Sequence, residues 1–180
     1  MSNDTTPDSD IEINADTATD ATEEAEPMRI LRITEFPSLS GRSQLIGHIS
    51  MNEQNAIFLR IWKNSGCGLF LPTWQSLAVL SKLLSVPGEF SSSALQPAWE
   101  GTSRNGAGFT TAHLLDEGLI ERSLTKRGAY RTADPGPFMR RIDALLAAGV
   151  NLDPDDEPSG ELTIAAQEVP KRGRPKKQAT

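Results

Sequence analysis

The stretch His113-Leu114-Leu115-Asp116-Glu117-Gly118-Leu119-Ile120-Glu121-Arg122 decides the fold that the sequence predicts. A helix running up to about Glu117 is expected to end at Gly118, because glycine readily takes the left-handed conformation that closes a helix. Residues 119–123 and 129–132 then read as two short strands around the turn Lys126-Arg127-Gly128. The stretch therefore predicts a helix that leads into a two-stranded hairpin.

Two more helical segments are expected before this one. Pro72-Thr73 can open the first, and apolar residues follow at helical spacing: Trp74, Leu77, Ala78, Leu80 and Leu84. Ser91–Ser93 supply N-cap candidates for a second, which Pro97 keeps short or irregular. The third starts either at Thr102-Ser103 or near Phe109. Both starts stay open because the two intervening glycines, Gly106 and Gly108, each cost up to about 1 kcal/mol in a helix.

Three helices, a strand, a basic turn and a second strand follow one another here, and residues 73–133 resemble a winged helix-turn-helix in that order. The resemblance implies that the third helix enters the major groove of DNA with its N-terminal residues towards the bases. Arg104 and Asn105 would then read base edges, and Lys126 and Arg127 would touch the backbone. Winged helices also serve as protein-interaction modules, so a protein partner for this part of the chain stays open.

The part before these helices is predicted to be rich in β-structure. Arg29–Ile33 reads as a first strand, and the apolar runs 44–50 and 56–63 read as a hairpin around residues 51–55. Residues 138–148 are predicted to form a closing helix. The body, residues 28–150, is therefore expected to be an α+β domain with a β-rich N-terminal part and a winged-helix-like helical part.

The second strand of that hairpin carries an aromatic and basic face. Strand alternation turns Ile57, Leu59 and Ile61 to one side and Phe58, Arg60 and Trp62 to the other. Such a face can be covered by the rest of the protein, or it can act as a stacking platform for unpaired bases. Both interpretations are kept.

Charge is distributed unevenly along the 180 residues, although the formal net charge is only −6. Residues 1–27 are acidic and poor in large apolar side chains, and they are expected to be a disordered tail. Residues 151–170 are also acidic and are expected to be a flexible linker, which at this length spans roughly 25 Å. The body and the last ten residues are basic, a division that points to polyanionic partners.

The last segment, residues 171–180, contains Lys171-Arg172-Gly173-Arg174-Pro175-Lys176-Lys177. It resembles an AT-hook, a minor-groove binder with the core Arg-Gly-Arg-Pro. The resemblance implies that Arg172 and Arg174 lie along the groove floor while the lysines touch phosphates. Gly173 would permit close approach of the backbone, Pro175 would keep the chain extended, and narrow A·T-rich grooves attract guanidinium groups. A solvated basic tail or a localisation signal is the plainer alternative.

Patterns that would indicate an enzyme are not found in the sequence. Cys67 is the single cysteine, so no disulfide framework or multi-cysteine zinc site is expected. Asn64–Gly68 is glycine-rich but lacks the ending of a phosphate-binding loop, and His48 and His113 have no ligand or nucleophile spacing around them. No run of about 20 apolar residues is present, so no membrane partner is expected. We expect no catalytic residue, metal or cofactor.

The sequence thus predicts a non-enzymatic, intracellular, DNA-associated protein. Its tail would bind the A·T-rich minor groove and its body duplex DNA, as in a transcriptional regulator or a nucleoid-, chromosome- or mobile-element-associated protein. A homodimer through the β-rich part is a further expectation. The alternatives are an adaptor that binds a protein and is anchored to DNA by the hook, or a binder of single-stranded nucleic acid.

Overall fold

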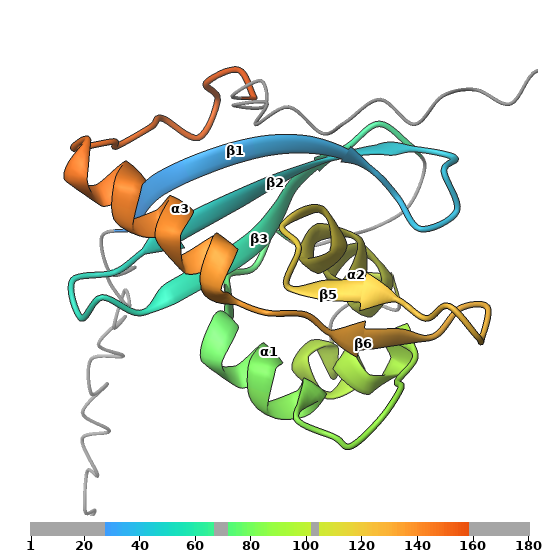
Figure 1. Ribbon diagram of the computed structural model, residues 1–180. Helices are drawn as coiled ribbons and strands as arrows, with labels where there is room; N and C mark the ends of the chain where they lie inside the picture. Colours follow the sequence, from blue (N-terminus) through green and yellow to red (C-terminus); the bar gives the residue numbers. More distant parts are fainter. Residues whose placement is uncertain (1–27, 67–71, 102–104, 159–180) are drawn as a thin grey trace, which may run out of the picture.

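The computed structural model describes residues 28–66, 72–101 and 105–158, which form one α+β body (Figure 1). The acidic tail 1–27, Arg104, and the hook with residues 159–170 before it lie outside the described residues. The predicted α+β class is confirmed. No helix in the described ranges is long and apolar enough to cross a membrane.

A four-stranded antiparallel sheet forms the N-terminal half. Its strands are β1 (Arg29–Pro37), β2 (Gln44–Met51), β3 (Ile57–Asn64) and the two-residue β4 (Gln75–Ser76), in the order β1-β2-β3-β4. The sequence predicts the first three strands, although β1 continues four residues beyond the predicted end at Ile33. It does not predict β4, because two residues are too few to show alternation. The pairing register shifts between Ile30 and Arg32 and between Ile46 and Gly47, as a β-bulge would require.

The helices pack on one face of this sheet (Figure 1). They are α1 (Leu77–Leu84), the 3-10 helix η1 (Ser92–Trp99), α2 (Gly106–Asp116) and α3 (Gly136–Ala147). Ala112 of α2 packs with Leu45 and Ile61, and Phe138 and Ile142 of α3 pack with Leu31 and Ile49. The predicted short second helix is thus a 3-10 helix, in keeping with Pro97 inside it.

A hairpin of β5 (Ile120–Arg122) and β6 (Tyr130–Thr132) joins α2 to α3. Ile120 and Tyr130 turn inward and join the cluster that contains Leu80, Leu95 and Leu114. The hairpin therefore rests on the helical core at its base, while its turn extends beyond the helices (Figure 1).

The winged-helix arrangement is not confirmed, although the order of the elements matches the prediction. The third helix, α2, lies between the sheet and η1, and Asp116 is its one fully exposed residue. Thr110, Thr111 and His113 are all buried. A recognition helix needs an exposed polar face to enter the major groove. Asn105, directly before α2, is exposed, but it lies outside the helix itself.

One buried carboxylate connects three parts of the fold. Glu117, directly after α2, is 1% exposed. Arg32 of β1 donates from Nε to Glu117 Oε1 at 3.1 Å, and Arg141 of α3 donates from Nη2 to Oε2 at 2.7 Å. The same Arg141 nitrogen also donates to the Glu117 backbone carbonyl at 2.8 Å. Glu117 thus ties the helical core to the sheet and to α3.

Glu117→Ala is expected to lower the free energy of unfolding by about 2–3 kcal/mol. Removing one partner of a buried ion pair costs up to about 3–5 kcal/mol, but both arginines here can still reach water. Glu121→Ala is the matched control, because Glu121 pairs with Arg131 at 2.7 Å with both side chains half-exposed. It should cost less than about 1 kcal/mol. Equal losses for the two variants in urea denaturation would contradict a structural role for Glu117.

The two glycines of α2 meet different surroundings. A Cβ at Gly106 would lie 2.2 Å from Trp99 Cδ2, whereas a Cβ at Gly108 would meet nothing within 4 Å. Trp99 cannot move away easily, because it is 3% exposed and its Nε1 donates to Thr110 Oγ1 at 3.1 Å. Gly106 is therefore required by packing, while Gly108 is not.

Gly106→Ala should destabilise the protein by at least about 1 kcal/mol, because an overpacked core must shift to admit the methyl group. Gly108→Ala should be neutral or stabilising by up to about 1 kcal/mol, since alanine is the better helix former. Thermal melting of the two variants beside the parent protein checks the pair. A stabilised Gly106→Ala protein would show that Trp99 leaves room for a methyl group at position 106.

Candidate nucleic-acid interface

The turn between β5 and β6 has an ordered backbone. Ser123 Oγ accepts hydrogen bonds from the backbone N–H groups of Thr125 at 3.0 Å and Lys126 at 2.8 Å. The Ser123 N–H donates to the Ala129 carbonyl at 2.9 Å, and Gly128 takes a φ of +74° that favours glycine. The Ser123 and Thr125 hydroxyls both donate to the Glu89 carboxylate. The loop is thus shaped before any partner binds.

This loop presents cations and one apolar side chain to solvent. Lys126 and Arg127 are exposed, and neither forms an ion pair within the described part of the chain. Leu124 is 91% exposed, more than any other large apolar residue among those described. We call residues 123–128 the hairpin loop. It combines a fixed backbone with unpaired basic side chains, as a phosphate-binding surface requires.

Asn105, the one predicted base-reading residue within the described part of the chain, does not lie at this loop. Asn105 is exposed just before α2 and lines a separate open cavity of about 620 Å³, together with Arg42, Asn64 and Phe109. No residue of the hairpin loop lines that cavity. Lys126 and Arg127 therefore lie together, Asn105 lies elsewhere, and Arg104 and Lys171–Lys177 fall outside the described residues.

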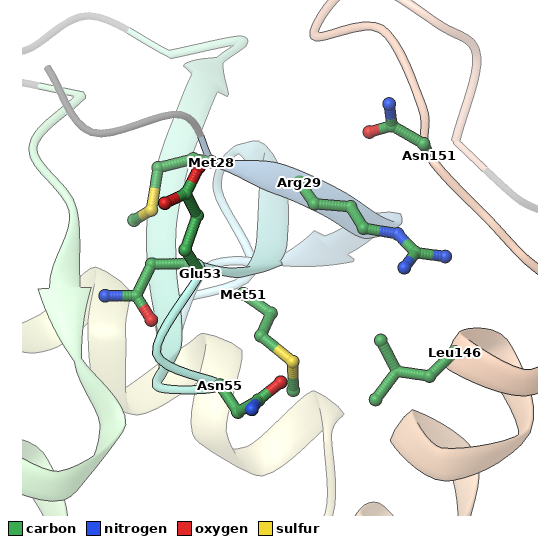
Figure 2. A pocket seen from close by; sticks show the side chains of 8 residues that line it. Met28, Arg29, Met51, Glu53, Asn55, Leu146 and Asn151 are labelled. Carbon is green, nitrogen blue, oxygen red and sulfur yellow. The ribbon is translucent and has the colours of Figure 1, made fainter.

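A second open cavity, of about 420 Å³, lies where the β2–β3 turn meets the end of α3 (Figure 2). Figure 2 shows Arg29 and Leu146 on one side of it and Met28 and Glu53 on the other. Arg29 Nε already donates to the Val150 carbonyl at 2.6 Å. The lining offers no nucleophile beside a base, so it suggests no reaction.

Both histidines are buried and neutral near pH 7. The pKa of His113 is lowered to about 4, mainly by burial; the Glu117 charge opposes this shift and the Arg32 charge adds to it. Burial and the charge of Arg60 are the main causes that lower the pKa of His48 to about 3. Neither group is poised to transfer protons at neutral pH. Within the described ranges, no three His, Cys, Asp or Glu side chains gather as a metal site.

The face of the sheet opposite the helices holds a cluster of Arg60, Trp62 and Trp74. The sequence placed Arg60 and Trp62 on one strand face but did not place Trp74 beside them. Arg60 lies between Trp62 and Trp74, with its guanidinium carbon 4.2 Å from each ring centroid. Trp74 was expected on the apolar face of a helix, but α1 begins later, at Leu77. Trp74 instead belongs to the segment that enters β4. No sequence signal places it over Arg60, because the strand pairing that does so spans only two residues.

The start of the predicted linker also lies on the sheet. Leu152 forms an isolated antiparallel bridge with Ile30 of β1. Asp155 accepts hydrogen bonds from Trp62 Nε1 at 3.3 Å and Lys63 Nζ at 2.9 Å. Composition alone predicted a flexible linker here and could not show where its charges would pair.

Comparisons with known proteins give no relative for this chain. No protein-family model, no curated protein and no solved structure matches it. Function is therefore inferred from the residues and their geometry.

Acidification should destabilise the fold between pH 6.5 and about pH 4. A buried histidine with a lowered pKa contributes stability that is complete above its unfolded pKa of about 6.5 and is lost as the pH falls towards the folded value of about 4. The slope should approach about 1.4 kcal/mol per pH unit for His113. His113→Gln should reduce that slope in denaturation measured at successive pH values, whatever its effect on absolute stability. An unchanged slope would mean that His113 titrates normally.

Proposed function

We propose that this protein binds duplex DNA without catalysing a reaction, with the hairpin loop on the sugar–phosphate backbone and the AT-hook-like tail in an adjacent A·T-rich minor groove. The observation that carries the proposal for the body is the ordered hairpin loop, whose Lys126 and Arg127 are exposed without ion pairs in the described part of the chain. A transcriptional regulator or a chromosome- or mobile-element-associated protein would use such a pair of contacts.

The chemistry of the loop suits a phosphate backbone. Lysine and arginine gain affinity for DNA by releasing condensed counterions, and this gain does not depend on sequence. An ordered loop loses little conformational entropy on binding, which preserves more of the interaction free energy. Leu124 stands between these cations and Arg122 in the sequence and is suited to apolar contact with sugars or base edges in a groove.

Sequence preference in this proposal comes from the tail. Arg172, Gly173, Arg174 and Pro175 match the AT-hook core, and two guanidinium groups favour the narrow, strongly negative A·T groove. Residues 151–157 lie on the sheet, so only the residues after them can act as a tether. If residues 158–170 are flexible, as their composition predicts, they span roughly 20 Å, which would allow both contacts on one duplex. Tethering raises the effective concentration of the second contact, so two weak contacts give a stronger combined affinity.

An adaptor that binds a protein through its body and DNA through the tail is the second candidate. Two observations favour it: α2 has no exposed face for the major groove, and Leu124 is 91% exposed at the hairpin tip. Exposed apolar residues ringed by polar ones occur at protein interfaces. The two candidates differ in whether the hairpin loop contributes to DNA affinity.

The test measures the binding of the full chain to A·T-rich and G·C-rich duplexes at several salt concentrations. Arg172→Ala/Arg174→Ala should abolish the A·T preference. Lys126→Ala/Arg127→Ala should weaken binding to both duplexes alike and reduce the log–log salt slope by about 2, since each phosphate contact contributes about 0.9. Lys82→Ala/Arg140→Ala removes two exposed cations elsewhere and is the matched control.

Each outcome separates the candidates. If the hairpin variant loses no more affinity than the Lys82/Arg140 control, the body does not contact DNA and the adaptor is favoured. If the parent protein shows neither A·T preference nor salt dependence, the DNA-binding proposal is wrong.

A further inference from the structure

The outer face of the sheet, opposite the helices, holds an arginine in a fixed position. The guanidinium carbon of Arg60 lies 4.2 Å from the ring centroids of both Trp62 and Trp74. Its Nε donates to His48 Nδ1 at 3.1 Å, and His48 is fully buried. Trp62 and Trp74 themselves are partly exposed. The face therefore presents two indoles around one cation, and the buried His48 imidazole accepts a hydrogen bond from that cation.

An acidic side chain already occupies the edge of this layer. A single oxygen of Asp155 accepts both the Trp62 indole N–H and the Lys63 ammonium group. These hydrogen bonds lower the pKa of Asp155, so it is an anion at neutral pH. The side chains of Lys63 and Asp155 are 54% and 75% exposed, so water competes for this contact. The two donors thus form an anion-binding position whose present occupant can be displaced.

We infer that Arg60, Trp62, Lys63 and Trp74 form a binding site for single-stranded nucleic acid. In this site a phosphate takes the place of the Asp155 carboxylate, and an unpaired base stacks on the accessible part of an indole. Phosphate oxygens accept the same charge-assisted hydrogen bonds as a carboxylate. Stacking of bases on aromatic side chains beside a basic groove is the usual way in which proteins hold single strands. This site is separate from the hairpin loop and goes beyond the proposed duplex contact.

A single strand fits this face better than a duplex does. Bases in a duplex are stacked on one another, so their faces cannot reach indoles on a sheet, whereas unpaired bases can be splayed onto them. An acidic peptide could replace Asp155 at the two donors but would leave the indole faces unused. The combination of indole surface and paired donors is what favours nucleic acid over an acidic peptide.

The acidic segment 151–157 then acts as an internal competitor for the site. Leu152 holds the segment at β1. A turn at residues 153–156 then positions Asp155. In this turn the Asp156 N–H donates to the Asp153 carbonyl at 3.1 Å, and the Asp153 N–H donates to Asp156 Oδ2 at 2.8 Å. A strand that binds must displace Asp155 first. Removing the Asp155 charge is therefore expected to raise affinity for single strands.

Tryptophan fluorescence tests the site directly, because the chain has three tryptophans. Trp62 and Trp74 are in the site, while Trp99 is 3% exposed in the core and supplies a constant background. The full chain carrying Arg172→Ala/Arg174→Ala, which weakens the tail, is titrated with short oligodeoxythymidylate, oligouridylate, a duplex, and poly-glutamate. We expect quenching by single strands, and the DNA and RNA arms show which sugar is preferred.

Variants then assign the signal to residues. Asp155→Asn should tighten single-strand binding several-fold, whereas Asp153→Asn, a nearby exposed acid of equal charge, should change it little. Trp62→Phe keeps the bulk of the side chain but removes the indole donor, and should weaken binding. Lys126→Ala/Arg127→Ala should leave the quenching intact, which keeps this site distinct from the duplex contact. A thermal melt of each variant verifies that it is folded.

Three results would overturn the inference. They are quenching by poly-glutamate but not by single strands, single-strand binding that Trp62→Phe leaves unchanged in a folded protein, and equal effects of Asp155→Asn and Asp153→Asn. The first would identify an acidic protein segment as the partner. The proposed duplex binding would stand or fall separately, on the hairpin and tail variants.

Discussion

The arrangement of this body depends on the ion pairs that the buried Glu117 carboxylate forms with two arginines. The carboxylate is enclosed where α2 ends and is shared by Arg32 from the first strand and Arg141 from the last helix. A buried carboxylate is tolerated only when its charge and lone pairs are satisfied. The three elements must therefore meet in one relative position, and partial docking would leave an unpaired charge in the interior.

The end of α2 at Glu117 also sets the direction in which the β5–β6 hairpin leaves the helical core. Gly118 follows Glu117 with a φ of +70°, and the Leu119 N–H donates to the Leu114 carbonyl at 2.9 Å, as in the closing turn of a helix. The chain then enters β5 directly. After β6 comes α3, whose Arg141 binds the same carboxylate. The hairpin loop is thus held at a defined place relative to the sheet by contacts at its base.

Sequence reasoning was most successful where a residue's own chemistry determines the local structure. Apolar runs between turn residues predicted β1 to β3, and Gly118 was placed correctly at the end of α2. Sequence reasoning failed for the environment of α2, which was expected to be an exposed reading helix because of its place in the order of elements. The structure shows how the residues of α2 are accommodated: Gly106 fits under Trp99, and Thr111 Oγ donates to the Ala107 carbonyl at 2.7 Å. Burial of small polar groups in this way depends on tertiary packing that no local pattern encodes.

The bridge between Leu152 and Ile30 has a consequence for how copies of this protein behave at high concentration. β1 is an outer strand of the sheet, and outer strands readily pair with strands of other molecules and so start aggregation. Leu152 occupies part of that strand at its beginning, while the exposed Glu35 and Pro37 lie towards its end. Charge and proline both discourage further pairing. The short acidic segment after α3 thereby also serves colloidal stability, because a chain ending before Leu152 would leave the beginning of β1 open to neighbouring molecules.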